Sequence, residues 1–140
     1  MRHYFKFNGV EATEKAPVEL DNSGGGGAVN FYSNVLDCNR QDDFGLMLYA
    51  VAKLISGSGS LLVNVEVCGA EDPINDWSPF VDFASSDDIT ISLASNPVGG
   101  IKTFPLTSGL GLIPGFARLR VNVPASTKVQ MYSALHFSED

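Results

Sequence analysis

The chain has few charged residues, and the basic ones are the scarcer. Its 140 residues include 9 Lys and Arg against 16 Asp and Glu, which gives a formal net charge of −7. Proteins that bind nucleic acids draw most of their affinity from a positive surface, and an anionic membrane attracts the same kind of surface. The shortage of basic residues therefore argues against both kinds of partner.

Long hydrophobic runs and cysteines are also lacking. No apolar stretch approaches the ~20 residues that span a bilayer, and residues 1–9 alternate in polarity where a secretory signal would have a continuous apolar segment. With only Cys38 and Cys68, we expect no disulfide framework and a reducing compartment by default. A single bridge between the two cysteines stays open for an oxidising environment.

The apolar content is sufficient for a folded core. Apolar residues make up 44% of the chain and charged residues 18%, the opposite of the balance in a disordered chain. The length fits one domain. The 14 glycines and 7 prolines predict many turns between short elements.

The first 27 residues differ from the remainder. They contain few large apolar residues after the first seven, and they end in a run of four glycines at 24–27. Because such a run has high backbone freedom, we predict an N-terminal arm and glycine hinge at 1–27, followed by a β-sandwich domain at 28–140.

The first seven residues show the alternation of a strand. His3, Phe5 and Phe7 would lie on one side of an extended chain, and Tyr4 and Lys6 on the other. This pattern favours a strand that adds to a sheet edge, either its own or a neighbour's.

The body contains about eight runs with the pattern of β-strands. The runs cover residues 28–36, 44–55, 61–68, 80–84, 89–93, 101–106, 118–123 and 128–137. The run at 44–55 is long enough for a helix, but the Gly-Ser turn after it and the alternating run that follows favour a strand; whether it is one strand or two stays open. Pro105 indicates that 101–106 is an edge strand. The pattern predicts an all-β fold, an antiparallel β-sandwich of jelly-roll type.

The sequence offers no local pattern for catalysis or metal binding. Its two histidines, His3 and His136, stand apart, and no G-x-S-x-G elbow or zinc spacing accompanies them. The glycine run leads into a strand and lacks the Gly-Lys-Ser/Thr of a phosphate loop. Acidic residues at 71, 72, 76 and 82 lack EF-hand spacing. We therefore predict no catalytic residue, no cofactor and no metal.

One aromatic residue stands out from the phenylalanines. Trp77, the only tryptophan, follows Asn75-Asp76 in a loop between strands. An indole at such a place either caps the core or stacks on a ligand.

Two stretches resemble small tailed-phage virion β-sandwich proteins. In residues 62–80, a strand of alternating valines runs into an Asp-x-x-x-Asp-Trp turn, and 117–132 resembles the closing hairpin of those proteins, with an Arg-x-Arg face at Arg118 and Arg120. The resemblance covers about residues 44–137. It implies a structural role in a capsid or tail, and it carries over no catalytic residue.

The resemblance and the predicted arm together favour a capsid decoration (cement) protein on the outside of a virion. Its partner would be the major capsid protein or another virion protein, and we expect a homo-oligomer, with a trimer favoured. Such a protein is made in the host cytoplasm. Tyr4, Phe5 and Phe7 would contact the capsid or a neighbouring subunit by strand addition.

The alternative is a glycan-binding module or a tail or fibre component that recognises host surface sugars. Trp77 and Tyr132 would then stack on sugar rings. A small hydrolase is a third reading, and the presence of only two histidines argues against it.

Overall fold

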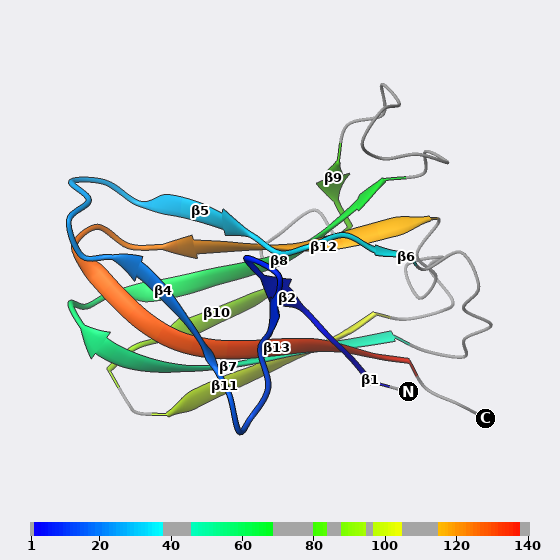
Figure 1. The fold of residues 1–140 in the computed structure, drawn as a ribbon, viewed down its shortest axis with the longest axis horizontal. Helices are drawn as coiled ribbons and strands as arrows, with labels where there is room; N and C mark the ends of the chain where they lie inside the picture. Colours follow the sequence, from blue (N-terminus) through cyan, green and yellow to red (C-terminus); the bar gives the residue numbers. More distant parts are fainter. Residues whose placement is uncertain are drawn as a thin grey trace.

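The computed structural model describes residues 2–37, 46–68, 80–83, 88–94, 97–104 and 115–137 (Figure 1). Within these ranges the chain forms thirteen strands and no helix. Two antiparallel sheets pack face to face around one hydrophobic core, which confirms the all-β sandwich. Both termini lie at the same end, at the right of Figure 1.

Five strands form one sheet and six form the other. The five-stranded sheet has the order β1-β13-β7-β11, with β4 also paired to β13. Its strands are β1 (Arg2–Tyr4), β4 (Val18–Asn22), β7 (Leu46–Ser56), β11 (Val98–Phe104) and β13 (Thr127–Phe137). The six-stranded sheet has the order β10-β8-β12-β5, with β6 paired to β12 and β9 to β8. Its strands are β5 (Val29–Tyr32), β6 (Leu36–Asp37), β8 (Ser60–Cys68), β9 (Val81–Asp82), β10 (Ile89–Ser92) and β12 (Phe116–Val123). A separate small hairpin joins β2 (Lys6–Phe7) to β3 (Val10–Glu11).

The connections cross repeatedly between the two sheets. The chain passes from β4 to β5, from β6 to β7, from β7 to β8 and from β10 to β11 by changing sheet, and again on either side of β12. The last strand lies beside the first. The jelly-roll topology that the sequence suggests stays a prediction.

Alternation on the long strands supplies most of the core. On β12 and most of β13 every second side chain is buried, and Lys128, Gln130 and Tyr132 between them face outward. Ala134 is the exception, since it is buried between Ser133 and Leu135. The largest fully buried side chains come from both sheets: Phe5, Leu48, Leu61, Ile91, Phe104, Leu119, Met131 and Leu135. Each fully buried side chain of this size stabilises the fold by roughly 1.5–3 kcal/mol.

The strand β8 departs from the predicted half-buried pattern. Besides its valines, Asn64 and Glu66 are buried, with 2% and 5% of their surface exposed. These two side chains point to the outer face by alternation. Arg118 and Arg120 on the neighbouring strand β12 cover Glu66 on that face.

The N-terminal segment belongs to the sandwich, so the prediction of a separate arm at 1–27 is wrong for residues 2–22. β1 pairs with the end of β13, from Arg2 opposite His136 to Tyr4 opposite Ala134, and β4 pairs with its beginning. Phe5 is fully buried and Phe7 is 3% exposed. The sequence left open whether the first strand adds to a sheet of its own chain or of a neighbour. In the structure it adds to a sheet of its own chain.

The glycine run is a fixed turn. The amide of Asn22 donates to the carbonyl oxygens of Gly27, Val123 and Pro124 at 2.9–3.2 Å. The backbone N–H of Ser126 donates to the carbonyl of Gly25 at 3.0 Å. A Cβ on Gly25 would overlap the Asn22 side chain. Glycine is therefore required at position 25 for close packing, and the run ties the start of β5 to the turn between β12 and β13.

Two other predictions are resolved by the sheet pairing. In its described part, the 44–55 run is a single strand, β7, because it pairs along its length with both β13 and β11. The predicted edge strand at 101–106 is confirmed as an edge, β11. It begins earlier than expected, since Gly99 and Gly100 are strand residues opposite Val51 and Ala50 instead of a turn.

Replacing Phe5 with alanine tests whether the N-terminal segment supports the core. We expect Phe5→Ala to lower the free energy of unfolding by about 3–5 kcal/mol, because a fully buried ring leaves a cavity. Urea unfolding measures the change. The control is Val10→Ala in the same segment, whose side chain is 59% exposed and whose loss should change stability by less than about 0.5 kcal/mol. Equal stability of the Phe5→Ala variant and the natural chain would contradict the assignment.

Candidate functional site

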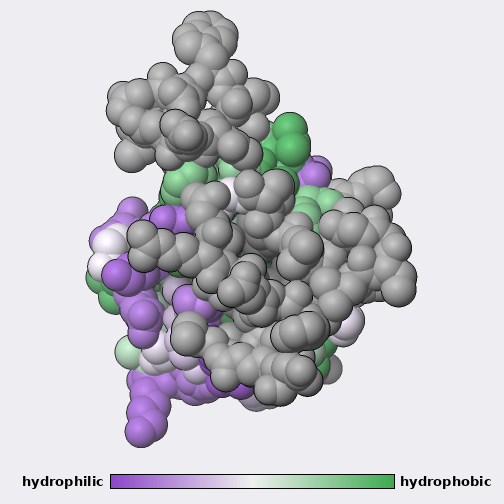
Figure 2. Space-filling view, turned by 90° about the vertical axis from the view of Figure 1, so that its right-hand side faces the viewer, coloured by the Kyte–Doolittle hydropathy of each residue, from purple (hydrophilic) through white to green (hydrophobic). Residues whose placement is uncertain are grey.

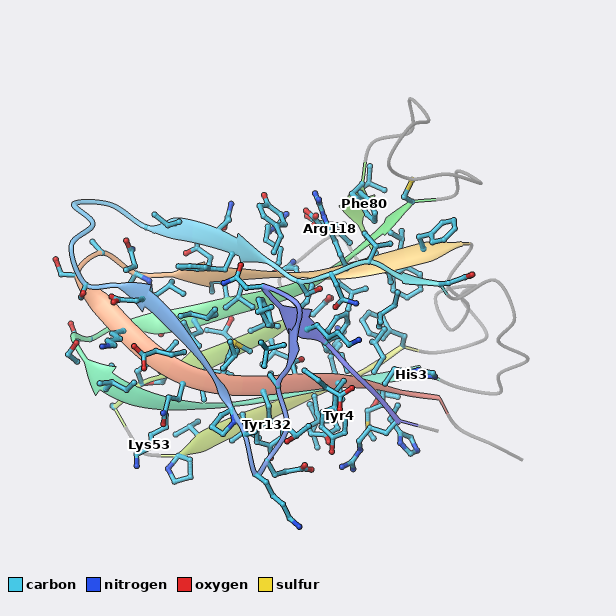
Figure 3. All side chains as sticks on the ribbon, viewed as in Figure 1. His3, Tyr4, Lys53, Phe80, Arg118 and Tyr132 are labelled. Carbon is cyan, nitrogen blue, oxygen red and sulfur yellow. The ribbon has the colours of Figure 1, made fainter. Side chains whose placement is uncertain are left out.

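Two groups of aromatic and charged side chains lie on opposite outer faces of the sandwich. Figure 3 places Tyr4, Tyr132 and Lys53 on the side of the five-stranded sheet, and Arg118 and Phe80 on the side of the six-stranded sheet. We name the first group the tyrosine face and the second the arginine stack.

The tyrosine face is built by the pairing of three strands. Tyr132 on β13 lies opposite Val51 on β7, and both Tyr49 on β7 and Tyr4 on β1 lie opposite Ala134 on β13. Alternation points all three tyrosines outward, because their chain neighbours on β7 and β13 are core residues. The face brings together residues from the beginning, middle and end of the chain.

A charged pair fixes one side of the tyrosine face. The hydroxyl of Tyr4 lies 2.8 Å from both carboxylate oxygens of Glu14 and donates to that carboxylate. Arg2 donates to Glu14 Oε1 and to the Tyr4 hydroxyl, both at 3.0 Å. The hydrogen bond from Tyr4 lowers the pKa of Glu14, and the positive charge of Arg2 acts in the same direction. Glu14 is therefore a carboxylate near neutral pH.

The other two tyrosines pack against each other. The Tyr49 and Tyr132 rings are edge to face, with centroids 6.1 Å apart and planes at 82°. The Arg2 guanidinium carbon lies 4.8 Å from the centre of the Tyr49 ring. Burial raises the pKa of both phenols above the ordinary value of 10.0, and that of Tyr49 by much more. The Tyr49 hydroxyl oxygen is buried and has no hydrogen-bond partner in the described structure.

Two shallow hollows adjoin on this face. One of about 270 Å³ is lined by Glu14, Lys53, Pro97, Gln130 and Tyr132, with Val51 below. The other, of about 370 Å³, is lined by Tyr49, Gly99, Ile101 and Tyr132, again with Val51. Tyr132 and Val51 border both hollows, so the Tyr132 ring lies at their junction.

The hollow beside Gly99 follows from the sequence of β11. Val51 lies opposite Tyr132 on one side and opposite Gly99 on the other, so a row across three strands reads Tyr, Val, Gly. A Cβ on Gly99 would lie 3.1 Å from the Val51 side chain. The missing side chain therefore leaves Val51 uncovered between Tyr132 and Ile101.

The arginine stack lies on the outer face of the six-stranded sheet. The Arg118 guanidinium carbon is 4.3 Å from the centre of the Tyr32 ring and 4.3 Å from that of Phe80. Its Nε donates to Glu66 Oε1 at 2.7 Å, and the two residues are direct cross-strand partners on β12 and β8. The stack joins β5, β12 and the residue before β9.

A second arginine extends the charge network. Arg120 donates to Glu66 Oε2 at 2.8 Å and lies 3.0 Å from Asp82 Oδ1. The two arginines cover the Glu66 carboxylate, which explains why this outward-facing side chain is buried. Desolvation favours a neutral arginine, but the nearby carboxylates outweigh it, and the pKa of Arg120 is raised.

Of the contact residues predicted from the sequence, only Tyr4 is on an outer face. Phe5 and Phe7 are core residues of this chain, so the prediction that they contact a neighbour is wrong. Tyr132, predicted to stack on sugars, lies on the tyrosine face next to Tyr4. Trp77 lies outside the described residues, as does Cys38.

The histidines and acidic residues form no recognisable catalytic or metal centre in the described part. Arg2 is the register partner of His136, and His3 pairs with Leu135, so alternation sends the two histidine side chains to opposite faces. Within the described ranges, no group of three His, Cys, Asp or Glu residues could hold a metal ion. Asp82 faces outward, as predicted, and its carboxylate pairs with Arg120.

Several residues of both groups were missed at the sequence level. Tyr49 occupies an alternating position in the 44–55 run, and this signal could have placed it beside Tyr132 once the two strands were paired. Arg118 and Arg120 were noted as a pattern, but their partner Glu66 was not singled out. No sequence pattern pointed to Glu14 or Lys53, because each lies on the tyrosine face only through strand pairing that the sequence does not specify.

Comparisons with known proteins give no assignment. No protein-family model matches the sequence, and no curated protein and no solved structure is significantly similar to it. In the described ranges there is no helix with the length and apolar character needed to cross a membrane.

The high pKa of Tyr49 predicts a loss of stability in alkali. The unfolded phenol ionises near 10.0, whereas the folded one stays protonated to much higher pH. The contribution of this group is therefore fully present below pH 10 and falls as the pH rises above it. The free energy of unfolding of the natural chain should fall relative to that of Tyr49→Phe as the pH rises from 8 to 11 in urea unfolding. A constant difference would contradict the burial of this phenol.

Removing the charge of Glu66 should destabilise the six-stranded sheet. Its side chain is 7% exposed and pairs with two arginines that are 29% and 24% exposed. We expect Glu66→Gln to cost about 1–3 kcal/mol, because both guanidinium groups lose a buried ionic acceptor. The matched control is Glu19→Gln, whose exposed pair with Lys128 should contribute less than about 1 kcal/mol. Equal effects of the two substitutions in urea unfolding would contradict the network.

Proposed function

We propose that the chain is a non-enzymatic structural protein of a tailed-phage virion, a decoration protein that binds the outer surface of the capsid and stabilises the shell. The resemblance of residues 62–80 and 117–132 to small phage virion proteins suggests this role. The antiparallel sandwich is compatible with it, since jelly rolls are common in capsid proteins.

The aromatic and arginine side chains of the arginine stack carry the proposal. Tyr32 lies opposite Arg120 on the outer face, 45% of its surface is exposed, and its ring packs on Arg118. Tyrosine and arginine dominate the energetics of protein interfaces, particularly where the side chains are already held in place. Arg118 is held between two rings and a carboxylate, so it loses little side-chain freedom on binding.

The edge of the six-stranded sheet offers a second kind of contact. Figure 2 shows the end of the sandwich where β1 begins and β13 ends; among its coloured residues, hydrophilic ones lie mainly at the left and a few hydrophobic ones in the upper half. The strand β5 is the last in its sheet. Such an edge supports strand addition by a partner.

The mechanism proposed here differs from clamping by an arm. Because residues 2–22 are paired within the chain, contact with the shell would use the rigid six-stranded face. The net charge of −7 suits a position outside the shell, away from packaged DNA. A homotrimer remains our expectation, and light scattering would give three times the 15.0 kDa chain mass.

Quantitative mass spectrometry of purified virions tests the role. We expect the chain in particles of the phage that encodes it, at a fixed ratio to the major capsid protein and removed without opening the shell. Absence from purified particles, or presence only inside them, would overturn the proposal.

Two variants test the surface. Tyr32→Ala should weaken binding to capsids stripped of this protein by about tenfold or more, because it removes an exposed interface tyrosine and one side of the Arg118 stack. Ile101→Ser, at a 69% exposed apolar residue of the other sheet, is the matched control and should bind normally. Equal losses, or a loss only in the control, would assign the contact to another surface.

A further inference from the structure

We propose that the tyrosine face is a saccharide-binding site, in which two consecutive neutral sugar rings occupy the two hollows on either side of Tyr132. The observations are the adjoining hollows of about 270 and 370 Å³, their shared aromatic border, and the mixed polar rim of one of them. The site lies on the opposite face from the arginine stack, so it is independent of capsid binding.

The floor and walls suit the apolar side of a sugar ring. Val51 lies below both hollows, and Tyr132 and Tyr49 supply aromatic surface beside it. A pyranose ring has C–H groups on one side and hydroxyls at its edge. Aromatic and aliphatic side chains therefore cover its ring, while polar groups must meet its edge.

The rim supplies several kinds of hydrogen-bonding group. Glu14, Lys53 and Gln130 line the same hollow, giving a carboxylate, an ammonium group and an amide. Lys53 and Gln130 are cross-strand partners on β7 and β13, and Lys53 has no ion pair within the described residues. Glu14 is already paired with Arg2, so Lys53 adds the only further charge among the named rim groups, and the set of polar groups suits a ligand with many hydroxyls.

Two features indicate that the face is organised before a ligand binds. Arg2 and Tyr4 hold the Glu14 carboxylate, whose oxygens keep further lone pairs for sugar hydroxyls. Tyr132 is braced by the edge-to-face contact with Tyr49. Preorganised groups lose little conformational entropy on binding, which matters for weakly held ligands such as sugars.

The absent side chain of Gly99 decides the length of the ligand. It leaves the second hollow open between Tyr132 and Ile101, so a ring bound beside Lys53 and Gln130 can be followed by another. We therefore expect a disaccharide to bind more tightly than its monosaccharide. A side chain at position 99 would fill the second hollow and abolish that difference; because its Cβ would also press on Val51, the monosaccharide affinity of the variant is measured as well.

Titration of the full chain with defined sugars tests the site. The probes are glucose, galactose and N-acetylglucosamine, their disaccharides in α and β linkage, and a sialylated trisaccharide as the acidic comparison. Amide chemical shifts measured by NMR report binding and its place. We expect shifts at Val51, Gly99 and Gln130 with at least one neutral disaccharide, and weaker binding of the corresponding monosaccharide.

Three variants separate stacking from folding. Tyr132→Ala should weaken disaccharide binding by about tenfold or more, while Tyr132→Phe, which keeps the ring, should stay within about threefold. Gly99→Val should reduce disaccharide affinity to that of the monosaccharide, and its backbone φ is not in the left-handed region that favours glycine. Tyr32→Ala, on the other sheet, should bind sugars normally.

The outcomes decide the site and the proposed function separately. Binding that survives Tyr132→Ala, tighter binding of the acidic trisaccharide, or no shift with any neutral sugar would each overturn the saccharide site. None of these results bears on Tyr32-dependent attachment to capsids. A chain that loses capsid binding in Tyr32→Ala and sugar binding in Tyr132→Ala would carry both activities on opposite faces.

Discussion

The structure depends on the position of the last strand, β13, inside the five-stranded sheet. Along one edge β13 pairs with β7, and along the other it pairs with β4 and then β1. Without these pairings the two N-terminal strands would have no sheet to join, and Phe5 would lose its place in the core. The backbone of Phe5 is also held directly, since its N–H donates to the carbonyl of Ser133 at 3.0 Å. One strand thereby joins the two ends of the chain to its middle.

The same pairing creates the tyrosine face. Tyr4, Tyr49 and Tyr132 are separated by more than forty residues along the chain at each step, and they meet because their strands are neighbours. The register decides which side chains adjoin: a shift of one residue on β13 would turn Tyr132 into the core. The Asn22 amide, which holds the turns at the far end of β4 and β12, helps to fix that register.

The two outer faces differ in how their buried polar groups are bonded. On the six-stranded sheet, the Glu66 carboxylate is covered by two arginines and is tolerated because both of its oxygens are bonded. On the five-stranded sheet, Tyr49 keeps a buried hydroxyl without a partner, a cost that the packing of its ring offsets. The first face is electrostatically satisfied and rigid, which suits a flat protein contact. The second is hollowed and retains unmet hydrogen-bonding capacity, which suits a small polar ligand.

Local patterning was sufficient to predict the all-β class, the long strands of the body and the outward direction of Tyr132, since alternation is a property of consecutive residues. It failed at the N-terminus. The N-terminal segment has few large apolar residues and ends in four glycines, so we predicted an arm and a hinge. Phe5, Phe7 and Leu20 nevertheless belong to the core, because the N-terminal strands pair with β13. Neither Glu66 nor Glu14 was singled out, because their partners are brought to them by the pairing and folding of other strands. The sequence by itself determined which residues alternate, while the tertiary structure alone decided which strands are neighbours and in what register. Pairing between distant strands is settled by the burial of the whole core, which no local pattern contains.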